Sequence, residues 1–281
     1  NQIVCVILHE KQTLLRMEKN HNNSYWFLFY QDKILVKKEE GGKYSIPFGE
    51  NPPIPATNSF EVVLDHDIPA HAASVDEAYP EDEQYLQIGL RASWDYLPKD
   101  WYKRAGKAYQ LVYWDRNSQY CPACGSPMTW HTHISKYCPK CKKETYPVIS
   151  PAIIVLIHKG EEVLLVHARN FKGSFHGLVA GFLEVGETLE QCIQREVMEE
   201  TGLTINHISY FGSQPWPYPS GIMVGFFADY VSGKIRLQDE ELSTGSFFSK
   251  DNLPELPSKL SIARRMIEWW LAGEKGEKPE F

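Results

Sequence analysis

Glu196, Glu199 and Glu200 stand close together in a segment whose apolar residues repeat at helical spacing. At about 100° per residue, Glu196 and Glu200 fall in the middle of the apolar stripe and Glu199 falls at its edge. Like charges four residues apart destabilise a helix, and burial removes the hydration of an unpaired carboxylate. A raised pKa or a bound cation would relieve this strain, and carboxylate oxygens suit Mg²⁺ or Mn²⁺. The alternative is a solvated acidic face, but charges that interrupt the apolar side favour a metal site.

The helix that must position these glutamates has clear start and stop signals. Its segment, residues 181–203, reads GFLEVGETLEQCIQREVMEETGL. Thr188 and Gln191 form a T-x-x-Q capping box at the start, and Gly202 supplies the C-terminal stop. These signals predict a helix of about four turns, at roughly 3.6 residues per turn.

The same segment resembles the Nudix box, G-x5-E-x7-R-E-U-x-E-E-x-G-U with U aliphatic, at every fixed position. These positions hold Gly181, Glu187, Arg195, Glu196, Val197, Glu199, Glu200, Gly202 and Leu203. The resemblance implies hydrolysis of a diphosphate linked to another moiety, with the R-E-U-x-E-E glutamates binding divalent metals on a loop–helix–loop. It gives Glu187 and Arg195 supporting roles, in which Arg195 pairs with acidic side chains. Glu200 or Glu199 would accept a proton from the attacking water, and the sequence leaves both open.

Four of the six cysteines form two C-x-x-C pairs with thirteen residues between them. The pairs are Cys121 with Cys124 and Cys138 with Cys141. This spacing predicts a zinc ribbon in which four thiolates bind one structural Zn²⁺ per chain. Disulfides would need an oxidising compartment, and nothing in the sequence indicates export. The other two cysteines, Cys5 and Cys192, are expected to be small core residues.

The second half of the ribbon is basic, with lysines at positions 136, 140, 142 and 143. A solvated charged face is the simpler interpretation, and a phosphate-rich ligand is the alternative. The whole chain of 281 residues has a net charge of −7, which argues against general nucleic-acid affinity but allows a local basic patch. No apolar run is long enough to span a membrane, and the first residues do not have the pattern of a signal peptide. We therefore expect a cytoplasmic protein that binds no membrane.

The length predicts about two domains and a small module. We expect an N-terminal α+β domain over 1–116, the zinc ribbon over 117–146 and a Nudix domain over 147–281. Strands are predicted at Ile3–Leu8, Tyr25–Tyr30, Lys33–Val36, Ile153–Ile157, Glu162–His167, Ile208–Phe211, Gly221–Tyr230 and Gly245–Ser249. Helices are predicted at Tyr85–Leu97, Trp101–Trp114 and near Ser258–Leu271, and a loop at Asp65–Glu83. The fold class is α+β, and the Nudix resemblance implies an α/β/α sandwich around a mixed sheet.

The segment after the box, residues 213–221, reads SQPWPYPSG. Its alternating prolines each restrict φ to about −65°, so the segment is a stiff extended loop that holds Trp216 and Tyr218 in place. Flat aromatic rings held this way can stack on a base or a nicotinamide; the alternative is a rigid surface loop that packs on the core.

This loop resembles the SQPWPFPxS signature of the Nudix NADH pyrophosphatases, the family that removes NAD caps from RNA. The resemblance also covers the zinc ribbon, the YPxxxP segment at Tyr146–Pro151 and the ARR segment at Ala263–Arg265. It extends from about residue 91 to residue 270, while residues 1–90 resemble the family only in position and size.

Residue by residue, the resemblance implies a specific site. The metal ligands would be the carboxylates of Glu196, Glu199, Glu200 and Glu241 and the backbone carbonyl of Ala180. The substrate would contact Arg91, Tyr146, Phe182, Gln214, Pro215, Trp216, Pro217, Tyr218, Pro219, Ser220, Gly221, Met223 and Ala263. The chain departs from the family pattern at His133, Gly221 and Gly245, and Glu241 could also be an ordinary surface acid.

The resemblance implies metal-dependent hydrolysis of the pyrophosphate of NAD(H) to NMN(H) and AMP, and removal of NAD caps to leave 5′-monophosphate RNA. It also implies two or three catalytic Mg²⁺ or Mn²⁺ ions and a homodimer. One alternative is a Nudix hydrolase of another nucleoside diphosphate, such as ADP-ribose. Another is a catalytically silent protein whose zinc ribbon binds RNA. The sequence leaves open the ranking of NADH, NAD⁺ and capped RNA.

Overall fold

The computed structural model describes residues 23–170, 173–238, 240–274 and 278. The strand predicted at Ile3–Leu8, with Cys5, lies outside the described residues. The chain divides into two compact units, 1–108 and 109–281, and the helix α2 (Lys99–Asn117) runs from the first into the second. No helix in the described part has the length and apolar character needed to cross a bilayer.

In the described part of the first unit, seven strands form one sheet in the order β3-β2-β1-β6-β5, with β4 paired to β1 and β7 to β2. The strands are β1 (Ser24–Tyr30), β2 (Lys33–Glu39), β3 (Lys43–Ser45), β4 (Phe48–Gly49), β5 (Thr57–Glu61), β6 (Ala70–Ser74) and β7 (Tyr85–Gly89). Short 3₁₀ helices lie at Glu40–Gly42, Asp65–Asp67 and Ala92–Asp95. The strands predicted in this unit at Tyr25–Tyr30 and Lys33–Val36 are confirmed.

Two predictions for the first unit are wrong. Residues 85–89 are not helical but form β7, which pairs antiparallel with the buried strand β2, with Val36 opposite Leu86. The predicted loop at 65–83 contains β6, which runs parallel to β1 with Phe27 opposite Ala72. Strand β7 forms backbone hydrogen bonds with β2, and β6 forms them with β1; in each pair the two strands are distant in sequence. The alanine-rich β6 has weak strand propensity of its own, so pairing with β1 decides its conformation.

The ribbon, in the second unit, contains β8 (Thr129–Thr132), β9 (Ser135–Tyr137) and β10 (Glu144–Thr145), joined as antiparallel neighbours. Lys136 does not belong to its basic face, because its side chain is only 2% exposed. Its Nζ lies 2.7 Å from Asp115 Oδ1 of α2 and within 5.5 Å of the ring centres of both Trp114 and Trp130. A buried lysine needs such a partner, since an unpaired buried charge is strongly destabilising.

The rest of the second unit is a mixed sheet with the order β14-β15-β11-β12-β16 among the described residues, and β13 paired to β11. Its strands are β11 (Ser150–Lys159), β12 (Glu162–Ala168), β13 (Val179–Phe182), β14 (Thr204–Trp216), β15 (Gly221–Ser232) and β16 (Leu242–Ser249). Strands β11 and β15 are parallel, and the other pairs are antiparallel.

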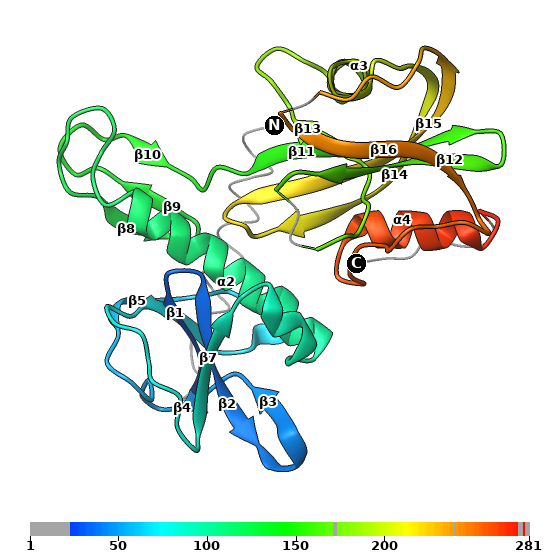
Figure 1. Ribbon diagram of the computed structural model, residues 1–281. Helices are drawn as coiled ribbons and strands as arrows, with labels where there is room; N and C mark the ends of the chain where they lie inside the picture. Colours follow the sequence, from blue (N-terminus) through cyan, green and yellow to red (C-terminus); the bar gives the residue numbers. More distant parts are fainter. Residues whose placement is uncertain (1–22, 171–172, 239, 275–277, 279–281) are drawn as a thin grey trace. The chain divides into compact units, whose positions relative to one another are not determined.

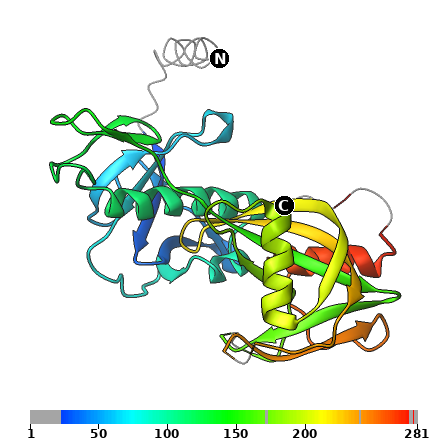
Figure 2. The same ribbon diagram turned by 90° about the horizontal axis from the view of Figure 1, so that it is seen from above.

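Two helices cover opposite faces of this sheet (Figure 1; Figure 2). Helix α3 (Leu189–Thr201) buries Cys192, Ile193 and Val197 against one face, and α4 (Ile262–Leu271) buries Met266 and Ile267 against the other. The predicted α/β/α sandwich is therefore confirmed, as is the core position of Cys192. Burial raises the pKa of the Cys192 thiol to about 11, which keeps it protonated and inert.

The five strands predicted for this sheet are present, but several are longer than their apolar runs. Strand β14 continues past Phe211 through Trp216, because Gln214 pairs with Met223 and Trp216 with Gly221. The first part of the proline loop is therefore a strand. Helix α4 begins at Ile262 rather than near Ser258, since the Ser261 hydroxyl accepts the Arg264 N–H and caps it.

Candidate active site

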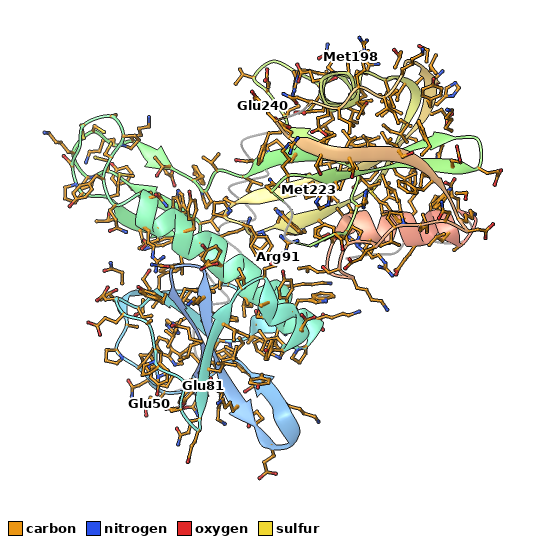
Figure 3. The ribbon with its side chains drawn as sticks, viewed as in Figure 1. Glu50, Glu81, Arg91, Met198, Met223 and Glu240 are labelled. Carbon is orange, nitrogen blue, oxygen red and sulfur yellow. The ribbon has the colours of Figure 1, made fainter. Side chains whose placement is uncertain are left out.

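Both ends of α3 carry the predicted caps, and these caps fix how the helix faces the sheet. The Thr188 hydroxyl accepts the Gln191 N–H at 3.2 Å, and the Gln191 side chain accepts the Thr188 N–H at 2.8 Å. Gly202, with φ of 69°, closes the helix by donating its N–H to the carbonyl of Met198. Met198 is exposed, and Figure 3 shows its side chain on the outer side of α3. The face toward the sheet carries Cys192, Ile193, Val197 and Glu200.

Glu200 is the most buried acid of the box, with 4% of its surface exposed. Burial, together with the negative charges of Glu196, Glu241 and Glu199, raises the pKa of its carboxyl to about 8. Among the described residues, no side chain donates a hydrogen bond or an ion pair to this carboxylate. A buried acid surrounded by acids and lacking a basic partner is a fitting ligand for a divalent cation.

Arg195 organises the remaining acids of the box. Its Nε and Nη2 bind both carboxylate oxygens of Glu187 at 2.6 and 3.0 Å, and Nη2 also donates to the Phe182 carbonyl. This bidentate pair holds the pKa of Glu187 at about 2. Arg195 Nη1 binds Glu196 at 2.9 Å and Glu199 at 3.1 Å.

Arg195 therefore supports Glu196 and Glu199 and leaves Glu200 without a counter-charge. Glu199 is the open member of the three, with 55% of its side chain exposed. The carboxylates share one region of negative charge, but they do not form a closed ligand set. Among the described residues, only the four ribbon cysteines have ligand atoms that all lie within metal-binding reach of one another.

Gly181 makes room for one of the glutamates. It lies on β13 opposite Ile153 of β11, and the carboxylate of Glu196 occupies the space where a side chain would begin. A Cβ at this position would approach that carboxylate more closely than real Cβ atoms approach any neighbour. The glycine of the box thus leaves room for the carboxylate of Glu196, a side chain that is 12% exposed and whose pKa is raised by partial burial.

We expect Gly181→Ala to lower metal-dependent turnover by about 10- to 100-fold, because displacing a catalytic group by about an ångström has effects of that order. Helix α3 has its own caps and core contacts, so the fold should persist. The measurement is kcat with Mn²⁺ together with Mn²⁺ affinity by electron paramagnetic resonance. Gly186→Ala is the matched control, since no atom lies within 4 Å of its Cβ position, although its φ of 90° adds backbone strain. Unchanged Mn²⁺ affinity in Gly181→Ala would contradict this account.

Glu241 reaches the same region from a different part of the sheet. It precedes β16 at a bulge, where the register shifts between His167 and Ala168 of β12. The Glu241 carbonyl accepts the Arg169 N–H at 2.8 Å, and the Ser243 hydroxyl donates to the His167 carbonyl at 3.0 Å. Bulges re-aim side chains in this way. The charge of Glu241 raises the pKa of both Glu196 and Glu200, which places it within electrostatic reach of them.

Arg169 and Ser243 hold this bulge by their hydrogen bonds. No local sequence signal marks either residue for this role, because the bulge depends on how two strands pair. Ala180, the predicted carbonyl ligand, lies on β13 beside Gly181 and opposite Ile154 of β11.

The proline loop presents its two aromatic rings edge to face. The Trp216 and Tyr218 ring centres are 5.0 Å apart at 81°, the Tyr218 N–H donates to the Trp216 carbonyl, and the Tyr218–Pro219 peptide is cis. A Cβ at Gly221 would lie 3.2 Å from the Trp216 carbonyl and 3.4 Å from that of Ser150. This tight approach favours glycine there and accounts for one departure from the family pattern.

The remaining predicted substrate residues differ in exposure. Tyr146 and Phe182 are 54% and 65% exposed, which suits a ligand contact. Gln214 is buried: it donates to the Leu260 carbonyl at 3.0 Å and accepts from Arg265. Ala263 is a buried residue of α4. Figure 3 places Met223 on β15, opposite Gln214 in register, and Arg91 in the first unit.

The other two departures lie elsewhere in the chain. A Cβ at Gly245 would meet Leu237 and Val166 at 3.0 and 3.1 Å, so glycine fits the packing of β16 against β12. His133 lies in the turn between β8 and β9.

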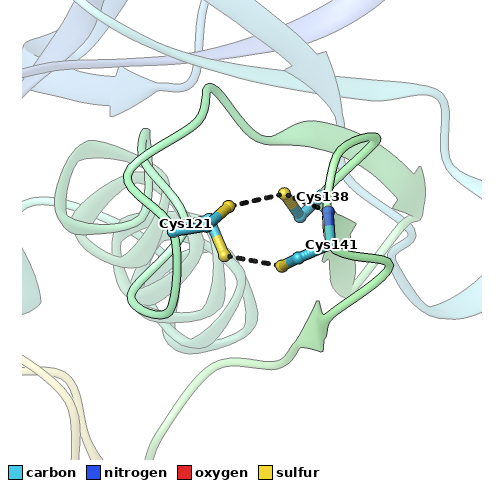
Figure 4. Close-up of side chains that lie close together, drawn as sticks. Cys121, Cys138 and Cys141 are labelled. Carbon is cyan, nitrogen blue, oxygen red and sulfur yellow. Dashed lines mark hydrogen bonds between the residues drawn. The ribbon is translucent and has the colours of Figure 1, made fainter.

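The four ribbon cysteines converge, as their spacing predicts, and Figure 4 shows Cys121, Cys138 and Cys141 of this group. Their sulfur atoms all lie within 4.8 Å of one another, and Cys121 and Cys138 are buried. A tetrahedral zinc site with Zn–S bonds of about 2.3 Å places its sulfur atoms about 3.8 Å apart, so the four thiols match this geometry. The cluster therefore suggests a structural zinc.

Comparison with known proteins identifies the family. The NUDIX domain model matches residues 148–270, and the model of the NADH pyrophosphatase-like rudimentary NUDIX domain matches residues 23–114. The second match corrects the expectation that residues 1–90 resemble the family only in position and size.

Curated relatives carry the name NAD-capped RNA hydrolase NudC. The protein from Klebsiella pneumoniae (strain 342) is 36% identical over 249 residues, which cover 84% of this chain and 95% of that protein. The one from Haemophilus influenzae (strain PittGG) is 40% identical over 198 residues, covering 69% and 74%. The one from Pseudomonas aeruginosa (strain LESB58) is 43% identical over 172 residues, and this alignment spans only 62% of its length. The chain thus belongs to the Nudix hydrolase family, in the NADH pyrophosphatase-like group of the NudC proteins.

Proposed function

We propose that this protein hydrolyses the pyrophosphate bond of NAD(H) to NMN(H) and AMP, and removes NAD caps from RNA to leave a 5′-monophosphate. The observation that carries the hydrolytic assignment is Glu200, a buried carboxylate among acids with no basic partner in the described structure. The relatives named NAD-capped RNA hydrolase support the choice of substrate. The SQPWPYPSG loop supports it independently, since its fixed aromatic rings suit a nicotinamide.

Members of this family need divalent metal ions. We propose two or three Mg²⁺ or Mn²⁺ ions held by Glu196, Glu199, Glu200 and Glu241 and by the Ala180 carbonyl. Such ions neutralise diphosphate oxygens and lower the pKa of a bound water. The chain contributes Arg195, which orients Glu196 and Glu199, and a carboxylate, Glu200 or Glu199, that accepts the proton from water. Glu200 must first lose its own proton, so metal affinity rises with pH up to about 8.

We expect Trp216→Ala to impair hydrolysis of NADH about tenfold more than hydrolysis of ADP-ribose, since aromatic stacking contributes roughly 1–3 kcal/mol per base. ADP-ribose keeps the diphosphate and adenosine but lacks nicotinamide. The measurement is kcat/KM for both substrates with product chromatography. The control is Trp269→Phe on α4, the helix that packs on the other face of the sheet from α3. Equal losses on both substrates would show that Trp216 only supports the fold.

The experiment that tests the function is incubation of the purified protein with NADH and with an NAD-capped transcript, with and without Mn²⁺. We expect metal-dependent release of AMP from NADH and a 5′-monophosphate transcript from the capped RNA. Faster hydrolysis of ADP-ribose than of NADH would indicate a Nudix hydrolase of another nucleoside diphosphate. No product from any of the three would indicate a catalytically silent protein.

We also propose the division into 1–116, 117–146 and 147–281, with one zinc ion per chain in the middle part. The match of the NADH pyrophosphatase-like model to 23–114 and of the NUDIX model to 148–270 supports these boundaries. Free thiols grouped for zinc suit a reducing compartment, which supports a cytoplasmic location. We propose a homodimer from the family resemblance, and sedimentation velocity tests it.

A further inference from the structure

The second zinc knuckle carries three lysines that the proposed chemistry does not use. Lys140, Lys142 and Lys143, here called the knuckle lysines, are all exposed and flank Cys141. None of them forms an ion pair with an acid of the described residues. The one side-chain hydrogen bond among them runs from Lys142 Nζ to the Pro139 carbonyl at 3.0 Å. In a chain with a net charge of −7, three uncompensated positive charges within four positions are unusual.

An aromatic side chain lies beside these charges. The Lys142 ammonium is 5.6 Å from the centre of the Tyr137 ring, and the His131 ring lies 5.7 Å from it on the other strand. Proteins that bind single-stranded nucleic acid without sequence preference combine positive charges along the phosphate backbone with aromatic rings on which the bases stack. Lys136 is excluded from this surface, because it is buried and paired with Asp115.

A short stretch of chain joins the knuckle to strand β11, whose first residue pairs with the end of the proline loop. Six residues lie between Lys143 and Ser150, so the seven Cα–Cα steps of an extended chain place them at most about 25 Å apart. Ser150 pairs with Gly221 and donates its N–H to the Ser220 carbonyl at 2.9 Å, while the Ser220 hydroxyl donates to the Val148 carbonyl. The segment that leaves the knuckle is therefore hydrogen-bonded to the loop proposed to hold the nicotinamide.

We propose that the knuckle lysines bind backbone phosphates of the RNA that follows the NAD cap, with Tyr137 as a stacking surface. This inference rests on the proposed function, because it assigns the RNA portion of the same substrate. NADH has no such portion, so the knuckle lysines distinguish capped RNA from the free dinucleotide. The alternative is that the lysines offset the net negative charge of the complex that a zinc ion forms with four thiolates.

The test compares Lys140→Glu/Lys142→Glu/Lys143→Glu with Lys159→Glu/Lys234→Glu/Lys250→Glu. The second variant is the control, since it reverses the same number of exposed charges on the Nudix sheet and its loops. Each protein is assayed for kcat/KM on NADH and on an NAD-capped single-stranded RNA. In parallel, binding of a 5′-monophosphate RNA of the same sequence is measured by fluorescence anisotropy from about 50 to 200 mM salt, the range over which phosphate contacts change affinity strongly.

We expect the knuckle variant to lose about tenfold or more in RNA affinity and in kcat/KM for capped RNA at low salt. Its salt slope should fall by about 2, since each lost phosphate contact on a single strand removes about 0.7. Turnover of NADH and zinc content should stay at the wild-type level, and the control variant should retain most RNA affinity.

Unchanged RNA affinity in the knuckle variant would overturn the proposal, whatever the enzyme activity. Loss of zinc, or an equal loss of NADH turnover, would show that the lysines serve the ribbon itself and would overturn it too. Failure of the wild-type protein to hydrolyse NADH and capped RNA would instead refute the proposed function, and the anisotropy measurement separates these two failures.

Discussion

Replacing Glu200 by glutamine is expected to reduce metal-dependent turnover of NADH by about 10²- to 10⁴-fold, the range typical for loss of a positioned acid or base. Glutamine keeps the size of the side chain but removes the negative charge that a divalent cation needs. The fold should persist, because Ile193 and Val197 anchor α3 to the sheet. Glu190→Gln is the matched control, since Glu190 is an exposed acid in the first turn of the same helix. Near-normal turnover in Glu200→Gln would remove Glu200 from the active site.

The same substitution should stabilise the metal-free protein. The folded pKa of Glu200 is about 8, above its ordinary value of 4.5, because the charged form is buried among acids. The folded state therefore binds the proton of Glu200 more tightly than the unfolded state does. The free energy of unfolding consequently falls as pH rises from about 4.5 to about 8. Glutamine never acquires this buried charge, so Glu200→Gln should be more stable than the wild type by several kcal/mol at pH 8, since a pKa raised by one unit corresponds to about 1.4 kcal/mol.

Urea unfolding in a chelator at pH 5 and pH 8 measures this difference, which should nearly vanish at pH 5. Higher stability together with lower activity is the pattern of a strained functional residue. A variant that is less stable than the wild type at pH 8 would show instead that Glu200 has a structural partner.

Replacing Cys138 by serine is expected to unfold the ribbon and release its zinc. Cys138 is fully buried, and a structural zinc contributes about 10–16 kcal/mol of folding free energy in small zinc domains. Two measurements report the loss: zinc content, and the near-ultraviolet circular dichroism of the Trp114–Trp130 pair, whose ring centres are 5.3 Å apart. Cys192→Ala is the control, because Cys192 is a buried residue of α3 and lies outside the cysteine cluster. Retention of both signals in Cys138→Ser would contradict a zinc ribbon.

The sequence by itself determined the features whose signals are local. Helix α3 has its capping box, its glycine stop and its apolar stripe within one short segment, so its bounds agree with the prediction. The cysteine pairs sit on tight knuckles, so their convergence also follows from short-range spacing. The strands around Ile153–Ile157 and Glu162–His167 were predictable because continuous β-branched and aliphatic runs need burial on both faces.

Only the tertiary structure decided features that depend on distant partners. Strands β6 and β7 form because β1 and β2 need neighbours, which no local pattern records. Lys136 is buried because Asp115 and two tryptophans surround it, although the next three lysines in the sequence are exposed.

The active region shows the same division. Glutamates at helical spacing are visible in the sequence, but the room that Gly181 leaves for Glu196 and the bulge beside Glu241 arise from strand pairing. The raised pKa of Glu200 belongs to this second group, because desolvation and charge repulsion depend on which atoms lie nearby in space.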